Sequence, residues 1–336
     1  MGRSLPRQHQ NHAKILSMKN LERVYIRLPN WIGDVCMSRP AIEAALASGL
    51  TIVACGKPWA QALMAELPGL QFLALSGQWR EDRQRIQAHR RAHPCSGRSV
   101  GLLLPDSLTS ALAFRLAGLP CAGYRDDGRS LLLKWGFTKP SQTLHAVQSW
   151  YWLTREAFAR WGVTLPVEPA DSLSLPSGAD AIAAAQAALL AADIKHAPIL
   201  IAPTATGEHK GKNKVWPHFN DLTRQLQAQG YTVVMSPPPN EVAQAQTNAP
   251  TATLLAALDL AAFVALLRQC SLVICNDSGV AHLAALTETP QLTLIGVTNP
   301  TRTRPWTPRA HLLGTYGQWP SVADVLNTVN QLLRNE

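Results

Sequence analysis

Strand-like and helix-like segments alternate along this chain of 336 residues, and the alternation occurs twice. The strand-like segments are short runs rich in Val, Ile and Leu, and most are followed by a segment of helical length. Such alternation predicts parallel sheets, because parallel strands need a helical crossover and are covered on both faces. The chain is therefore expected to be an α/β protein with two domains facing each other across a cleft.

The first domain is expected to span residues 21–165 and the second residues 179–336, joined by a linker at 166–178 that is rich in Pro and Ser. The strands expected in the first domain are 24–28, 50–54, 70–75 and 99–104, with helices at 37–47, 58–67, 107–116 and 146–161. The strands expected in the second are 199–203, 231–235, 272–275 and 292–295, with helices at 179–192, 219–229, 261–269, 280–287 and 322–333.

The charge balance narrows the class of partner. A net charge of +9 favours a nucleic acid, an acidic membrane surface or a phosphorylated substrate as the partner.

The six cysteines include no Cys-x-x-Cys pair, which indicates buried free thiols in a reducing compartment. No apolar run is long enough to span a bilayer. Residues 1–20 are polar and basic, so they predict a flexible tail and not a secretory signal. A cytoplasmic protein is expected.

The motif Asn276-Asp-Ser-Gly-Val-Ala-His282 follows a strand and begins a helix. Asp277 and Ser278 are good N-cap residues, so one interpretation is simply a capped helix. The other is a diphosphate site, because Gly279 lets a ligand approach the backbone and His282 lies one helical turn further on. The two interpretations are about equally supported by the spacing alone.

The segment Pro29-Asn-Trp-Ile-Gly-Asp34 also leads from a strand into a helix. Asp34 could cap that helix, which is the commoner role of Asp at such a position. Alternatively, its carboxylate could accept a proton from a hydroxyl nucleophile as a general base.

A basic loop follows the first strand of the second domain. It carries Thr204, Thr206 and three lysines, Lys214 among them, and could neutralise a phosphate at the carboxyl ends of the strands. The alternative is a solvated loop in which Trp216 packs and Pro217 begins a helix.

Metal and nucleic-acid sites have weaker support. His89, His93 and Cys95 are spaced like metal ligands, but arginines lie between the two histidines and the sequence has no second cluster of ligands to complete a site. A solvated basic face is therefore the simpler interpretation, and no metal is expected. The tryptophans follow no nucleic-acid-binding pattern, so nucleic acid is supported by charge alone and is not expected as a partner.

Taken together, these motifs resemble those of the lipopolysaccharide heptosyltransferases, glycosyltransferase family 9, and are nearest the type II enzymes. The first matching motifs are Leu28-Pro-Asn-Trp-Ile-Gly-Asp-Val35, Leu104-Pro-Asp-Ser-Leu-Thr-Ser-Ala111 and Ala117-Gly-Leu-Pro120. The others are Lys214-Val-Trp-Pro217, Cys275-Asn-Asp-Ser-Gly-Val-Ala-His-Leu-Ala-Ala285 and Asn299-Pro-Thr-Arg-Thr-Arg-Pro305. They occur in the family's order over roughly residues 22 to 335.

The resemblance implies a GT-B fold with two Rossmann-like domains, the first for the acceptor and the second for the donor. It implies transfer of heptose from ADP-heptose to the heptose–Kdo inner core on lipid A, with inversion and without metal or cofactor. Asp34 is similar in position to the family's catalytic base. The donor's nucleotide and diphosphate are expected at Thr204, Thr206, Lys214, Glu241, Asp277, Ser278, Gly279 and His282. The acceptor or cleft is expected at Asn30, Trp31, Gly33, Asp106 and Ser107.

The chain also departs from the family pattern. Pro203-Thr204-Ala205 replaces Pro-Gly-Ala, and Ser236-Pro-Pro-Pro-Asn240 replaces a Gly-containing turn near the nucleotide, where prolines remove N–H donors. A different sugar nucleotide or a protein acceptor is therefore an alternative, as is a nucleotide-sugar binding protein without activity. An anionic acceptor on lipid A would also place the protein at the inner face of the bacterial inner membrane, as a peripheral contact.

Overall fold

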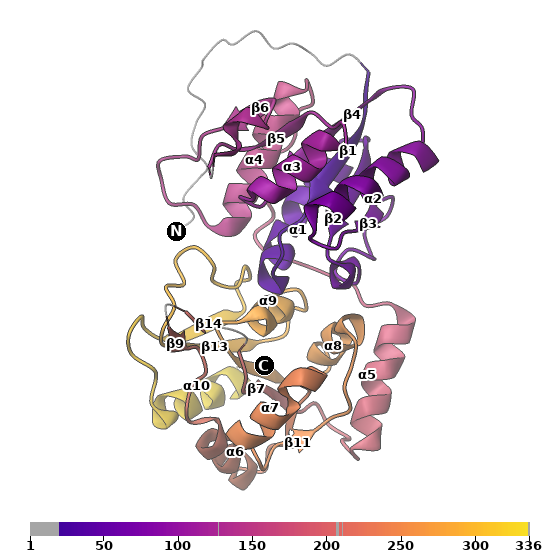
Figure 1. Ribbon diagram of the computed structural model, residues 1–336. Helices are drawn as coiled ribbons and strands as arrows, with labels where there is room; N and C mark the ends of the chain where they lie inside the picture. The colour runs from indigo at the N-terminus through magenta and orange to yellow at the C-terminus, as the bar shows by residue number, and fades with distance from the viewer. Residues whose placement is uncertain (1–19, 127, 206–207, 210, 335–336) are drawn as a thin grey trace. The chain divides into compact units, whose positions relative to one another are not determined.

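The computed structural model describes residues 20–334 except 127, 206–207 and 210. It divides into two compact units, Met1–Ala170 and Asp171–Glu336, and the division falls within the segment expected to be a linker (Figure 1). Each unit is a sheet of parallel strands flanked by helices, so the expected α/β class is confirmed. The expected tail at residues 1–20 lies outside the described residues apart from Asn20.

The N-terminal unit has a six-stranded sheet in the order β3-β2-β1-β4-β5-β6. Its strands are β1 (Leu21–Arg27), β2 (Thr51–Gly56), β3 (Gln71–Ala74), β4 (Arg98–Leu103), β5 (Cys121–Tyr124) and β6 (Trp135–Phe137). The helices are α1 (Ile32–Leu46), α2 (Trp79–Ala92), α3 (Leu108–Leu116) and α4 (Ala146–Arg160). Helices α2 and α3 pack together over one face of the sheet, and α1 packs against α4. Because β1 and β4 are neighbours, the loops that follow them lie side by side.

Most elements expected in this unit are present, but one is wrong. Residues 58–67 were expected to form a helix, yet only Pro58–Gln61 forms a short 3₁₀ helix (η1), followed by turns. Hydrogen bonds there join residues three apart, as from Met64 N to Gln61 O, so the segment continues as tight turns and not as an α-helix. Helix α2 and the short strands β5 and β6 were not expected.

The C-terminal unit has a second six-stranded parallel sheet, in the order β11-β10-β7-β12-β13-β14. Its strands are β7 (Ile199–Ala202), β10 (Val233–Met235), β11 (Thr253–Leu254), β12 (Leu272–Asn276), β13 (Gln291–Ile295) and β14 (Ala310–Gly314). The helices are α5 (Ala179–Ala191), α6 (Phe219–Ala228), α7 (Val242–Asn248), α8 (Leu260–Leu267), α9 (Gly279–Ala285) and α10 (Val322–Arg334). A small antiparallel pair, β8 (Glu208–His209) and β9 (Lys212–Asn213), lies in the loop after β7, and a 3₁₀ turn, η3 (Pro239–Glu241), precedes α7.

Two further expectations can be compared with the structure. All six cysteines are free thiols, and all are buried except Cys95, which is half-buried. Within the described ranges, no helix has both the length and the apolar character needed to cross a membrane.

Candidate functional site

Asn276 connects the three segments that form the expected donor site in the C-terminal unit. It is the last residue of β12 and is fully buried. Its Oδ1 accepts a hydrogen bond from Trp216 N at 2.8 Å, and its Nδ2 donates to the carbonyls of Ala202 and Thr204, each at 3.2 Å. One side chain therefore fixes the loop after β7 and the segment after Lys214 against the end of β12. Asn276 belongs to the motif that precedes α9, but a role in joining these segments was not predicted from the sequence.

The start of α9 carries buried polar atoms without partners. Ser278 is the N-cap residue, yet neither its side chain nor any other caps this helix with a hydrogen bond. Ser278 Oγ and His282 Nδ1 are both buried with no hydrogen-bond partner. Since buried polar groups in native proteins are nearly always satisfied, two such atoms at a helix start indicate a place for a ligand. The simple capped-helix interpretation is not what the structure shows.

His282 is electrically neutral at physiological pH. Burial lowers the pKa of its imidazole to about 4, and this effect exceeds the opposing influence of Asp277. Lys214 lies close enough to lower the same pKa further. Lys214, Asp277 and His282, which are distant in sequence, are thus gathered at one edge of the sheet. A neutral imidazole beside a lysine can hydrogen-bond an anion without adding charge.

Thr204 and Glu241 also come together. Thr204 is buried directly after β7, and its Oγ1 donates a hydrogen bond to Glu241 Oε2 at 2.5 Å. Glu241 is held at the end of η3, the turn formed by the proline-rich segment. The structure therefore joins two residues that were expected from separate loops to contact the donor. Thr206 lies outside the described residues.

Asp34 is a half-buried carboxylate in the first turn of α1. Burial raises its pKa from the ordinary value of 3.8 to about 6. It makes no hydrogen bond or ion pair to any described residue, and Trp31, the N-cap residue, has no side-chain cap either. Asp34 thus does not cap the helix, whereas a desolvated carboxylate with a raised pKa suits proton transfer near neutral pH.

The other residues expected near Asp34 have varied surroundings. Trp31 is 71% exposed, and Gly33 is buried. Asn30 is exposed, and its Oδ1 accepts a hydrogen bond from Arg27 Nη2 at 2.6 Å. Trp31 thus presents an exposed aromatic ring three residues before Asp34 in the chain.

Asp106 and Ser107 have partners within the N-terminal unit. Asp106 is paired with Arg129 Nη2 at 2.7 Å and Lys139 Nζ at 2.5 Å, and Ser107 Oγ caps α3 by accepting from Ser110 N. Arg129 is fully buried and also donates to the Pro105 carbonyl at 2.7 Å. It anchors the loop after β4. Nothing in the sequence pattern distinguished this arginine from the exposed ones.

The candidate metal ligands do not form a site. His89 stacks on His93 with ring centroids 4.3 Å apart, and its Nδ1 hydrogen-bonds with the Tyr25 hydroxyl at 3.0 Å. Cys95 Sγ donates to the Gly97 carbonyl. Among the described residues, no group of three or more His, Cys, Asp or Glu side chains could hold a metal ion.

Comparison with known proteins places this chain in a family. The family model for glycosyltransferase family 9 (heptosyltransferase) matches residues 98–328. The chain belongs to glycosyltransferase family 9. The match includes Lys214, Glu241 and the segment from Asp277 to His282, but Asp34 lies before it.

Relatives of this family 9 member are similar over part of their length. The lipooligosaccharide heptosyltransferase 2 of Haemophilus influenzae is 31% identical over 118 residues, which are 32% of this chain and 34% of that protein. The chain thus matches about a third of the length of this curated relative. The lipopolysaccharide heptosyltransferase 2 of Salmonella typhimurium is 30% identical over the same length.

Solved structures extend the likeness over the whole fold. The E. coli ADP-heptose lipopolysaccharide heptosyltransferase II has a TM-score of 0.72 at 22% identity, covering 93% of this chain and 99% of that one. A glycosyl transferase family 9 protein of Veillonella parvula has a TM-score of 0.78 at 17% identity, covering 95% and 99%. The expected GT-B class of fold with two Rossmann-like units is confirmed.

Proposed function

We propose that this chain is an inverting heptosyltransferase that transfers heptose from ADP-heptose to the inner core of lipopolysaccharide, the heptose–Kdo saccharide on lipid A. The observation that carries the proposal is the pair of unpartnered buried atoms, Ser278 Oγ and His282 Nδ1, together with the proximity of Lys214 to His282. The names of the relatives support heptose as the sugar, and that of the E. coli structure supports ADP as the carrier.

The C-terminal unit would hold the donor. Lys214 would neutralise the diphosphate, and Ser278 and His282 would supply the hydrogen bonds that their buried atoms lack. Gly279 would leave room for the phosphates at the start of α9. Glu241, oriented by Thr204, would accept hydrogen bonds from the ribose hydroxyls. Thr206 and Asp277 remain expected contacts in the same loops.

The N-terminal unit would supply the base. In the proposed step, the acceptor hydroxyl oxygen attacks the anomeric carbon of heptose, and the bond from that carbon to the β-phosphate oxygen breaks. ADP leaves with the electron pair, and Asp34 takes the proton of the hydroxyl. Lys214 and the donors around it stabilise the charge that develops on ADP. Attack from the face opposite to ADP inverts the anomeric centre. Asn30, Trp31, Gly33, Asp106 and Ser107 stay predicted acceptor or cleft residues.

The site as proposed needs no metal or other cofactor, since protein cations carry the leaving-group stabilisation. Full activity in the presence of EDTA is the expected result. We further propose that the enzyme works in the cytoplasm, at the inner face of the inner membrane, because its acceptor is an anionic saccharide on a lipid.

The test combines donor screening with product analysis. ADP-heptose should raise the melting temperature more than UDP-, GDP- or other ADP-sugars. Incubation of the preferred donor with lipopolysaccharide that ends at the heptose–Kdo inner core should then add the mass of one heptose. Asp34→Ala should slow this addition by about 10²–10⁴ while keeping the thermal shift. Preference for another sugar nucleotide, or transfer to a protein, would establish the alternative transferase. Donor binding without transfer to any acceptor would indicate a binding protein.

A further inference from the structure

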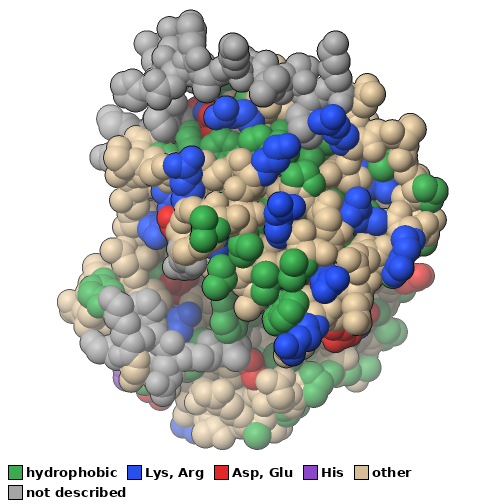
Figure 2. All heavy atoms as spheres, turned by 45° about the horizontal axis from the view of Figure 1, so that its top comes forward, with side chains coloured by type: hydrophobic (Ala, Val, Ile, Leu, Met, Phe, Trp, Pro, Cys, Tyr) green, Lys and Arg blue, Asp and Glu red, His purple; other side chains and the backbone are tan. Residues whose placement is uncertain are grey.

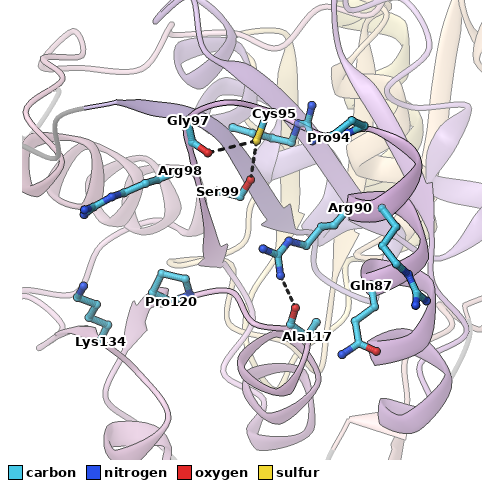
Figure 3. A pocket seen from close by; sticks show the side chains of 12 residues that line it. Gln87, Arg90, Pro94, Cys95, Gly97, Arg98, Ser99, Ala117, Pro120 and Lys134 are labelled. Atoms are coloured by element: carbon cyan, nitrogen blue, oxygen red, sulfur yellow. Dashed lines mark hydrogen bonds between the residues drawn. The ribbon is translucent and has the colours of Figure 1, made fainter.

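A hollow of about 730 Å³ opens at the amino edge of the N-terminal sheet (Figure 3). It is lined by residues at the amino ends of strands, namely Arg23 of β1, Arg98 and Ser99 of β4, Pro120 before β5 and Lys134 before β6. The end of α2 closes the other side with Arg90 and Arg91. Asp34 follows the carboxyl end of β1. The hollow, at the amino ends of the strands, therefore lies at the opposite end of the sheet from the proposed base.

The lining of this basic hollow includes five cations and no Asp or Glu: Arg23, Arg90, Arg91, Arg98 and Lys134. None of the five forms an ion pair with a described residue. The neighbouring Glu22 has its carboxylate engaged by Gly97 N at 2.7 Å and by Ser96 Oγ at 3.2 Å. Like charges without counter-charges repel, and a bound anion relieves that repulsion.

The two innermost arginines are held by uncharged groups. Arg23 is 6% exposed, and its Nη1 donates to the His93 carbonyl at 2.5 Å, while its Nε is buried without any hydrogen-bond partner. Arg90 Nη1 donates to the Ala117 carbonyl at 2.5 Å. Carbonyl oxygens position both guanidinium groups but do not cancel their charges. The hollow therefore gathers five cations that no ion pair among the described residues neutralises.

Apolar side chains continue from this hollow across the surface. A second hollow of about 450 Å³ shares Pro120 and Lys134 with the first and is lined also by Arg115 and Leu131. Leu131 is 95% exposed, and Leu116, beside Arg115, is 43% exposed. Figure 2 shows this edge of the N-terminal unit, with hydrophobic side chains among those of Lys and Arg. Exposed leucines among cations are typical of surfaces that bind the interface of an anionic bilayer.

We propose that the basic hollow and the two exposed leucines dock this protein on a bilayer that contains anionic phospholipids. The cations bind headgroup phosphates, and Leu131 and Leu116 enter the boundary of the acyl chains. The chain's own residues 1–19 are an unsuitable occupant, because they include Arg3, Arg7, Lys14 and Lys19 but no Asp or Glu. Nucleic acid would use the cations but would leave the leucines without a role.

This docking surface deepens the membrane contact of the proposed function but does not involve the donor site, so the two are tested separately. Binding of the full chain to phosphatidylglycerol-containing vesicles and to phosphatidylcholine vesicles is measured by co-sedimentation, with ADP affinity followed by calorimetry. Arg98→Ala with Lys134→Ala should weaken vesicle binding by about 25-fold, at roughly fivefold for each cation lost. Leu131→Ser should weaken it roughly fivefold.

The matched control is Arg224→Ala with Arg334→Ala, which removes the same charge from exposed positions of the C-terminal unit and should leave vesicle binding within twofold. Wild-type protein that ignores anionic vesicles would overturn the proposal, as would an equal loss in the control pair. Duplex DNA binding that falls with the Arg98 and Lys134 changes, together with vesicle binding unaffected by Leu131→Ser, would assign the surface to nucleic acid instead. If the wild-type protein does not bind ADP, that result would count against the proposed donor site alone.

Discussion

Replacing Asp34 by Asn should stabilise the N-terminal unit while removing activity. Burial raises the pKa of this carboxyl from 3.8 to about 6, so folding penalises its charged form. Two pKa units correspond to about 3 kcal/mol at pH values well above 6. The amide of Asn keeps part of the desolvation cost, so we expect a gain of roughly 1–2 kcal/mol. For a unit of this size that is a rise in melting temperature of roughly 3–6 °C.

The sign of the effect depends on pH. Well below pH 3.8 the carboxyl is protonated in both the folded and the unfolded chain, so wild type and Asp34→Asn should be equally stable there. The difference should emerge as pH rises from 4 to 6, because the unfolded chain loses its proton first, and should then stay constant. For the same reason, kcat/KM of the wild type should rise through about pH 6 as Asp34 ionises, whereas Asp34→Asn should lose about 10²–10⁴ in rate.

The assay is thermal and urea unfolding at pH 4 and pH 7.5, with ADP affinity measured in parallel. Glu66→Gln is the control, since it removes an exposed carboxylate from the same unit and should change stability little. A variant Asp34→Asn that melts at or below the wild type at pH 7.5 would refute the argument from desolvation. So would a gain of equal size at pH 4.

Three further variants test individual contacts. Lys214→Ala should weaken ADP binding by about 10- to 100-fold, the range for a charge-assisted contact to phosphate, and calorimetry with no change would remove its diphosphate role. Asn276→Ala should destabilise the C-terminal unit by about 2–4 kcal/mol, because Trp216 N and two carbonyls lose their partner, and urea unfolding measures this. Arg129→Met should lower the free energy of unfolding of the N-terminal unit by about 2–4 kcal/mol, because the Pro105 carbonyl loses its partner and Asp106 loses one of its ion pairs. Stability equal to that of the wild type would contradict the anchoring role of Arg129.

Several features of the site follow from the sequence directly. Strands such as β1, β7 and β12 are runs of apolar residues with polar turns behind them, and this local pattern predicted both the parallel sheets and the loops at their carboxyl ends. Thr204, Lys214 and the start of α9 were expected at one ligand site for that reason. The structure brings Thr204 onto Glu241 and Lys214 close to His282.

Short elements carry too little local signal to be predicted. Strands β6 and β11 have three and two residues, so pairing with a neighbouring strand defines them more than their own side chains do. The segment 58–67 failed differently, since its apolar spacing suited a helix but its backbone hydrogen bonds join residues three apart. Helix α2 was hidden because its many charged residues read as an exposed basic face.

The sequence by itself determined the alternation of strands and helices and the places where loops carry Gly, Asp and Lys, because those depend on neighbours along the chain. Only the tertiary structure decided which polar groups lose water. Burial by distant residues raises the pKa of Asp34, keeps His282 neutral and leaves Arg23 without a counter-charge. Burial and hydrogen bonding act through space, between residues as far apart in sequence as Trp216 and Pro320, and no local pattern records them.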